Sequence, residues 1–163
     1  MTADHGLTHV DATGAARMVD VSGKDVSVRS AVATGRVLVS PEVVAALRAG
    51  GVPKGDALAV ARIAGIQAAK RTPDLVPLCH PIAIHGVTVD LEVHDDHVAI
   101  AATVRTADRT GVEMEALTSV AVAGLALIDM VKALDPAAVI TDVRVEEKLG
   151  GKTGEWQRPL DRA

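Results

Sequence analysis

Aromatic residues are almost absent from this sequence of 163 residues. Trp156 is the single tryptophan, and the chain contains no phenylalanine and no tyrosine. A protein that binds single-stranded nucleic acid or RNA by base stacking needs aromatic rings, so the composition argues against a nucleic-acid partner. The core must instead be built from valine, alanine, leucine and isoleucine, whose small side chains let helices and sheets approach closely.

Cysteine, excess charge and targeting segments are scarce as well. One cysteine excludes an intramolecular disulfide and any metal site built from several cysteines. The net charge of −4 gives no general attraction to a polyanion, so a phosphate ligand needs a local cluster of cations. The N-terminus lacks the layout of a secretory signal, and the most apolar run, residues 116–128, is shorter than a membrane span. We therefore expect a cytoplasmic protein with no membrane partner.

One stretch, residues 74–82 with the sequence DLVPLCHPI, concentrates proline beside the only cysteine. Pro77 and Pro81 each fix their own φ angle and favour extended geometry in the preceding residue. Cys79 and His80 should therefore lie in a stiff, non-helical segment with their side chains pointing apart. Because His80 then cannot readily act as a base for Cys79, we interpret Cys79 as a wall residue and not a nucleophile.

The hydrophobic periodicity predicts the order of strands and helices. Strands are expected over residues 26–39, 84–93, 98–106 and 139–145, and helices over residues 41–50, 57–71 and 110–134. Ser40 and Asp56 are the expected N-caps, and Thr110-x-x-Glu113 has the sequence of a capping box. This is the βαββαβ order of an α+β, ferredoxin-like sandwich, with an antiparallel sheet and helices on one face. We expect a loosely structured segment 1–24, one domain over 25–149 and a flexible tail 150–163.

The last predicted helix is apolar almost all round between residues 116 and 128. One sheet face cannot cover both sides of such a helix, so we expect another subunit to cover the rest. Glu115 and Asp129, near its two ends, are within about 40° of each other around the axis but roughly 21 Å apart along it. Two such helices packed antiparallel across a two-fold axis could bring these ends together. A site that used both residues would therefore be shared between subunits.

Several charged residues have both a functional and a structural interpretation. Lys54 lies in a Pro/Gly turn at a helix N-terminus, which favours an anion, but surface lysines commonly serve solubility. The capping box alone could explain Glu113, whereas Glu115 has no such explanation. Asp129 and Lys132 have the spacing either of a surface ion pair or of a site.

Two further patterns fail as functional motifs. GGKTG resembles part of a phosphate loop, but residue 146 is glutamate where the motif needs glycine, and no helix is expected after it. His94-x-x-His97 has the spacing of metal ligands, but it lies in a predicted turn with no third ligand nearby. We therefore expect no metal site.

Four longer motifs are distributed along the chain between Leu7 and Gly154. They read LTHVDATGAARMVDVSGK, KGDALAVARIAGIQAAKRTPDLVPLCHPI, RTGVEMEALTSVAVAGLALIDMVKA and KLGGKTG. On these motifs the sequence resembles the cyclic pyranopterin monophosphate synthase family of molybdenum cofactor biosynthesis. The resemblance implies that 3′,8-cyclo-7,8-dihydroguanosine triphosphate is rearranged to cyclic pyranopterin monophosphate with loss of pyrophosphate. It also implies a ferredoxin-like fold, a homohexamer built as a trimer of dimers, and no cofactor, with the presence of Mg²⁺ on the triphosphate left open.

The matching motifs also imply roles for individual residues. Catalytic roles fall on Lys54, Asp129 and Lys132. Our hypothesis is that the two lysines exchange protons while Asp129 either orients Lys132 or tunes its pKa. Eight positions are implied to bind substrate: Leu78, Cys79, His80, Met114, Glu115, Glu113, Lys70 and Lys148. The chain departs from the family at Val131, where many relatives have cysteine. The alternative to an enzyme is a protein of another functional class, a non-catalytic nucleotide-sensing module with the same fold.

Overall fold

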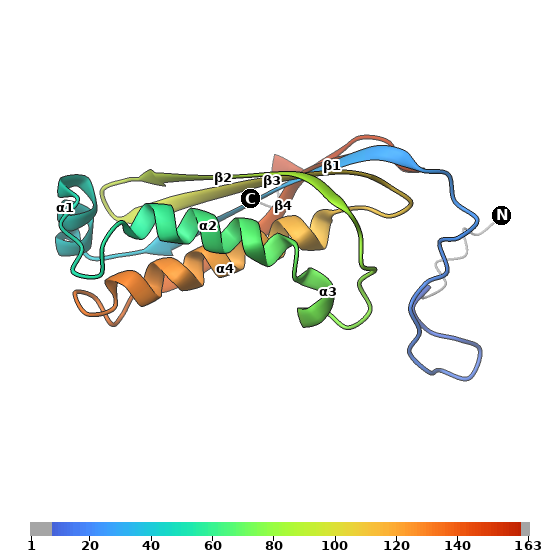
Figure 1. The fold of residues 1–163 in the computed structure, drawn as a ribbon, viewed down its shortest axis with the longest axis horizontal. Helices are drawn as coiled ribbons and strands as arrows, with labels where there is room; N and C mark the ends of the chain where they lie inside the picture. The colour runs from blue at the N-terminus through green and yellow to red at the C-terminus, as the bar shows by residue number, and fades with distance from the viewer. Residues whose placement is uncertain (1–7, 161–163) are drawn as a thin grey trace.

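A computed structural model describes residues 8–160 of the chain (Figure 1). Its elements in chain order are β1 (Ser27–Leu38), α1 (Pro41–Ala49), α2 (Ala57–Ala69), α3 (Thr72–Leu75), β2 (Ile84–Val93), β3 (His97–Asp108), α4 (Glu113–Val131), β4 (Val139–Leu149) and β5 (Trp156–Gln157). The strands form one sheet in the order β2-β3-β1-β4-β5, and every neighbouring pair is antiparallel.

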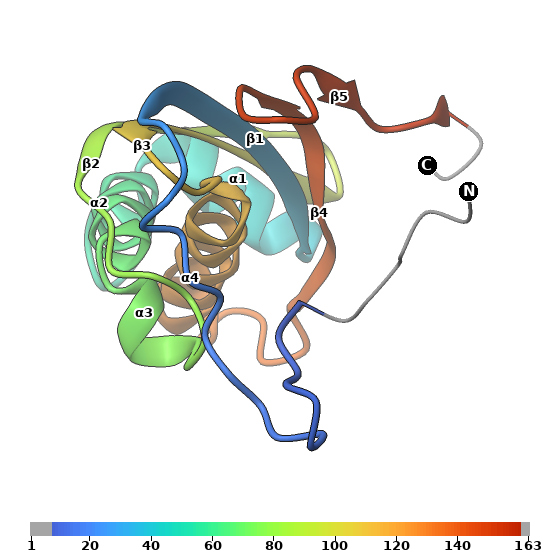
Figure 2. The same cartoon turned by 90° about the vertical axis from the view of Figure 1, so that its right-hand side faces the viewer.

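The helices α2 and α4 run side by side along one face of this sheet, while α1 stands at one end of the molecule (Figure 1). The order of strands and helices and the one-sided helical layer confirm the predicted α+β, ferredoxin-like fold. Strand β5 adds to it at the free edge of β4, where Lys148 pairs with Trp156 (Figure 2). Part of the expected tail is therefore paired with the sheet, and the division of the chain into three segments stays a prediction.

Local capping explains where two of the helices begin. The Ser40 hydroxyl accepts a hydrogen bond from the Val43 N–H, and the Asp56 carboxylate accepts one from the Ala59 N–H, as predicted. The predicted capping box at the start of α4 is wrong. The helix begins at Glu113 after Val112, whose apolar side chain cannot cap it, and the Glu113 carboxylate instead contacts Lys148.

The proline-rich stretch is non-helical only from Val76 onward. Residues 72–75 form the single turn of α3, so the prediction of a non-helical segment was wrong for its first two residues, 74 and 75. The physical reason is that Pro73 falls in the first turn, where a missing N–H breaks no helical hydrogen bond. Cys79 and His80 lie beyond this turn in irregular backbone, as expected.

The core is made of small aliphatic residues, as the composition required. In the centre of the sheet Ala33 of β1 faces Ala102 of β3, and both side chains are fully buried. Between the helices, a Cβ atom at Gly65 of α2 would lie only 3.1 Å from the Cβ of Ala123 in α4. The absence of larger side chains at these positions lets α2 approach α4 closely and lets both helices pack on the sheet.

Helix α4 is, by length and composition, the one helix within residues 8–160 that could cross a membrane. The helix is longer than the apolar run of residues 116–128 because it includes residues on both sides of that run. Half of the apolar window is buried against the sheet and α2, which is the environment of a core helix. On its outer side Leu125 is 60% exposed.

Candidate active site

The predicted site residues fall into two clusters at opposite ends of α4. The helix is unbroken from Glu113 to Val131, and its 19 residues span about 27 Å at the rise of an α-helix. A small ligand therefore cannot contact both ends of α4 within one chain, as the sequence argument required.

The cluster at the C-terminal end joins the three predicted catalytic residues. The Lys54 ammonium, from the turn before α2, lies 2.8 Å from the backbone oxygen of Asp129 and 3.2 Å from its carboxylate. Lys132 Nζ lies 2.7 Å from the same carboxylate oxygen. The hydrogen bonds from Lys132 and then from Lys54 lower the pKa of Asp129 below its ordinary value. We call these three residues the lysine–aspartate cluster.

All three side chains of the lysine–aspartate cluster are about half exposed. Ion pairs at such positions contribute at most about 1 kcal/mol to folding, so stability alone gives little reason to place two ammonium groups on one carboxylate. The arrangement does leave both ammonium groups accessible to an anionic ligand.

The cluster at the N-terminal end of α4 surrounds a cavity of about 410 Å³, which we call the α4 pocket. Six predicted substrate-binding residues line it: Leu78, Cys79, His80, Glu113, Met114 and Glu115. They come from the loop after α3 and from the first turn of α4. The fold thus brings together residues of two sequence motifs, such as His80 and Glu113, which are 33 positions apart in the sequence.

Glu115 is the buried carboxyl group of this pocket, with only 3% of the residue exposed. Burial, assisted by the charge of Glu113, raises the pKa of Glu115 to about 7 despite an opposing backbone hydrogen bond. A carboxyl group with such a pKa can both donate and accept a proton near neutral pH. Burial also raises the pKa of the Cys79 thiol, with Glu115 adding to the effect. A thiol kept neutral agrees with its interpretation as a wall residue.

The N-terminal segment contributes residues that the sequence analysis did not assign to the site. His80 Nε2 lies 2.6 Å from the carbonyl oxygen of Val19. Because a carbonyl oxygen can only accept, this nitrogen is protonated and donates a hydrogen bond to it. His9 and Lys24 line the α4 pocket from the same segment. Both residues belong to the first family motif, LTHVDATGAARMVDVSGK, and this was the one sign in the sequence that they could belong to the site. Arg17 belongs to the same segment but does not line the pocket.

A smaller cavity of about 340 Å³ adjoins Glu113 on the side of β4. It is lined by Glu113, Val145, Lys148, Thr153, Glu155 and Trp156. Lys148, another predicted substrate-binding residue, lies 3.1 Å from the Glu113 carboxylate. Among the eight predicted substrate-binding residues, Lys70 alone lies outside both cavities in the part of the chain that the structure describes. It is exposed at the C-terminal end of α2.

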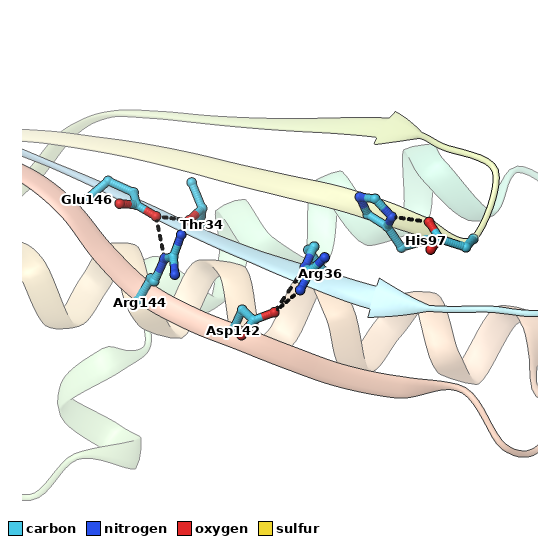
Figure 3. A network of polar contacts seen from close by, with 7 residues as sticks. Thr34, Arg36, His97, Asp142, Arg144 and Glu146 are labelled. Carbon is cyan, nitrogen blue, oxygen red and sulfur yellow. Dashed lines mark hydrogen bonds and ion pairs between the residues drawn. The ribbon is translucent and has the colours of Figure 1, made fainter. Parts of the chain in front are cut away.

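A larger cavity, of about 850 Å³, lies on the other face of the sheet, away from the helices. Along β1 and β4 the charged groups pair with one another: Arg36 pairs with Asp142, and the Glu146 carboxylate accepts hydrogen bonds from Thr34 and Arg144 (Figure 3). Asp90 and Glu92 of β2 also line the cavity but are not part of this network. Of the residues within 8–160 that line it, none is a predicted site residue. Because both arginines that line this cavity are already paired with carboxylates, the two clusters of α4 are the better candidates for a site that binds an anion.

The structure also bears on metal binding. Within residues 8–160, no group of three or more histidine, cysteine, aspartate or glutamate side chains is arranged to hold a metal ion. The rings of His94 and His97 stack with their centroids 4.5 Å apart, and His97 Nδ1 contacts Asp96 instead. The expectation of a site without metal stays a prediction.

One end of α4 thus carries two accessible ammonium groups on one carboxylate, and the other end carries a buried carboxyl group in a pocket. On a ferredoxin-like sandwich, these groups are suited to acid–base chemistry on an anionic ligand. Comparison with known proteins identifies the family within this class of protein. The model of the MoaC family matches residues 18–151, and the chain belongs to this family.

Close relatives cover nearly the whole chain. A protein of Streptomyces avermitilis is 71% identical over 156 residues, which are 96% of this chain and 92% of that relative. One of Nocardioides sp. is 70% identical over 94% of this chain and 96% of its own length. One of Mycobacterium tuberculosis is 58% identical over 93% of this chain and 91% of its own length. The first two are named cyclic pyranopterin monophosphate synthase and the third cyclic pyranopterin monophosphate synthase 2, which favours an enzyme over a sensing module.

Proposed function

We propose that this chain is a cyclic pyranopterin monophosphate synthase of molybdenum cofactor biosynthesis. It converts 3′,8-cyclo-7,8-dihydroguanosine triphosphate to cyclic pyranopterin monophosphate and releases pyrophosphate. The observation that carries the proposal is the 71% identity to a relative of that name over 96% of the chain. The two clusters at the ends of α4 supply the groups that the reaction needs.

The lysine–aspartate cluster supplies positive charge and mobile protons. Asp129 holds the ammonium groups of Lys54 and Lys132 on one carboxylate, so that a triphosphate can be neutralised there without a protein-bound metal. Each lysine can give a proton to the reacting substrate and recover one while Asp129 keeps it in place. We propose that no cofactor is needed, and pyrophosphate release with and without EDTA tests whether Mg²⁺ accompanies the triphosphate.

The α4 pocket supplies a second acid–base group. The pKa of Glu115, about 7, gives it comparable populations of acid and base at neutral pH. Rearrangement of the guanine-derived ring to a pterin moves protons at several atoms, so it requires groups that both donate and accept. Leu78, Cys79 and Met114 form apolar surface around this carboxyl group.

We further propose that one complete site combines the lysine–aspartate cluster of one subunit with the α4 pocket of another. The length of α4 separates the two clusters within a chain, and antiparallel packing of two α4 helices would bring them together. The outer surface of the helical layer carries exposed apolar side chains suited to such contact, among them Leu125 and Ile63. We expect a cytoplasmic homohexamer built as a trimer of dimers.

The function is tested by pyrophosphate release from the cyclised guanosine triphosphate, measured for the wild type and for Lys54→Ala. We expect release by the wild type and none by the variant. Arg48→Ala is the matched control, because Arg48 also forms an exposed ion pair, 2.9 Å from Asp95, but lies outside both clusters. Binding without release by the wild type would contradict the synthase and favour the nucleotide-sensing module.

The shared site is tested separately by subunit mixing. Lys54→Ala lacks a residue of one cluster and Glu115→Ala a residue of the other. In a shared site, a mixed oligomer regains some complete sites, so activity should return when the two inactive variants are unfolded and refolded together. Refolding each variant alone is the control. With an affinity tag on one variant only, co-purification of the untagged variant shows that the oligomers are mixed. No recovery of activity in such a mixture would contradict the shared site.

A further inference from the structure

The C-terminal strand places the only aromatic side chain of the chain next to the site. Trp156 of β5 pairs directly with Lys148 of β4. Directly opposite residues in an antiparallel pair project from the same face of the sheet, so the indole lies beside the Lys148 side chain. Lys148 in turn contacts Glu113 at the start of α4.

The cavity lined by Trp156 shares one lining residue, Glu113, with the α4 pocket. Glu113 lines both hollows, and Lys148 and Glu155 add further charged groups to the smaller one. Its volume of about 340 Å³ lies at the lower end of the range for ligand pockets. A flat apolar surface with a few charged groups around it is the arrangement that binds a polar fused ring.

One face of the indole is already held by the protein. The Arg158 guanidinium lies over the ring, 5.9 Å from its centroid, and its Nε donates a hydrogen bond to the Val145 carbonyl oxygen. Arg158 is absent from the described residues that line the cavity, whereas Trp156 is present and 37% exposed. The arginine therefore supports the ring from one side and leaves indole surface facing the cavity.

We propose that Trp156 is a further substrate-binding residue, and that its indole stacks on the guanine-derived fused ring of the substrate. This inference rests on the proposed function, because it is that substrate which supplies the ring. Any base can stack on an aromatic side chain, but the contact requires an aromatic face, which an aliphatic residue lacks. Loss of the stacking contact should raise KM by roughly 5- to 150-fold.

The first test compares two replacements in the pyrophosphate-release assay. Trp156→Leu keeps an apolar side chain that suits a strand but removes the π-face, and we expect KM to rise in the stated range. Trp156→Phe keeps an aromatic ring and should restore KM to within a few-fold of the wild type. Leu160→Ala, at a residue that is 95% exposed in the same segment, is the control and should leave KM unchanged.

The second test uses the fluorescence of Trp156, which reports on this residue alone because the chain has no other tryptophan and no tyrosine. On rapid mixing of the wild type with the cyclised guanosine triphosphate, we expect quenching before pyrophosphate is released. Unchanged fluorescence, or equal losses for Trp156→Leu and Trp156→Phe, would overturn the stacking contact even if the wild type is active. Quenching without any pyrophosphate release would leave the contact standing and contradict the proposed function.

Discussion

Replacing Glu115 with glutamine should remove most of the pH dependence of stability between pH 5 and 8. The pKa of Glu115 rises from an ordinary value of 4.5 to about 7 in the folded protein, mainly because of burial. Glu115 is therefore protonated in the folded state, while it ionises in the unfolded state, over the whole interval between these values. The unfolded state binds fewer protons there, so the contribution of Glu115 to stability is fully present below pH 4.5 and is lost as the pH rises through about 7.

The size of the effect follows from the difference in pKa. Each pKa unit corresponds to about 1.4 kcal/mol, so the wild type should lose up to about 3 kcal/mol in the free energy of unfolding across this interval. Glu115→Gln cannot ionise and should lose much less. The assay is denaturant unfolding at a series of pH values and at a fixed protein concentration, because subunit association would otherwise contribute.

Glu113→Gln is the matched control for this prediction. Glu113 lies two residues away but contacts Lys148 at 3.1 Å and is more exposed than Glu115. The control should keep most of the wild-type loss, with a small reduction because the charge of Glu113 contributes to the raised pKa of Glu115. Equal pH dependence in the wild type and Glu115→Gln would refute the assignment of a raised pKa to this residue.

Three further predictions concern packing and the lysine–aspartate cluster. Gly35→Ala should destabilise the fold by about 1–3 kcal/mol, because its Cβ would lie 2.7 Å from a methyl carbon of Val120; chemical denaturation measures this against Gly86→Ala, where the space is open. Leu127→Ala, at a fully buried position, should cost about 2–5 kcal/mol in the same assay, and a loss below about 1 kcal/mol would contradict tight packing of α4 on the sheet. Asp129→Ala should abolish pyrophosphate release and change stability by no more than about 1 kcal/mol, since the carboxylate is exposed; near-normal turnover would remove Asp129 from the catalytic assignment.

The sequence predicted the order of elements because that order depends on local patterns. Alternation of apolar residues identified the four long strands, and the capping residues Ser40 and Asp56 fixed the starts of two helices. Such signals act between residues a few positions apart, so they can be interpreted without the rest of the chain. The first turn of α4 was predicted incorrectly because Glu113 contacts Lys148, 35 positions away in the sequence, and not the residues of a local cap.

The sequence by itself also determined which residues could form the site, since the motifs contain both lysines, Asp129 and the residues around Cys79. Only the tertiary structure decided which of them meet. It brought the carbonyl group of Val19 within hydrogen-bonding distance of His80, 61 positions away, and it paired Trp156 with Lys148. It also buried Glu115 and so raised its pKa, a property that depends on the surrounding protein and not on neighbours in the sequence. Long-range contact and desolvation arise only when the chain is folded, which is why these features could not be derived from the sequence.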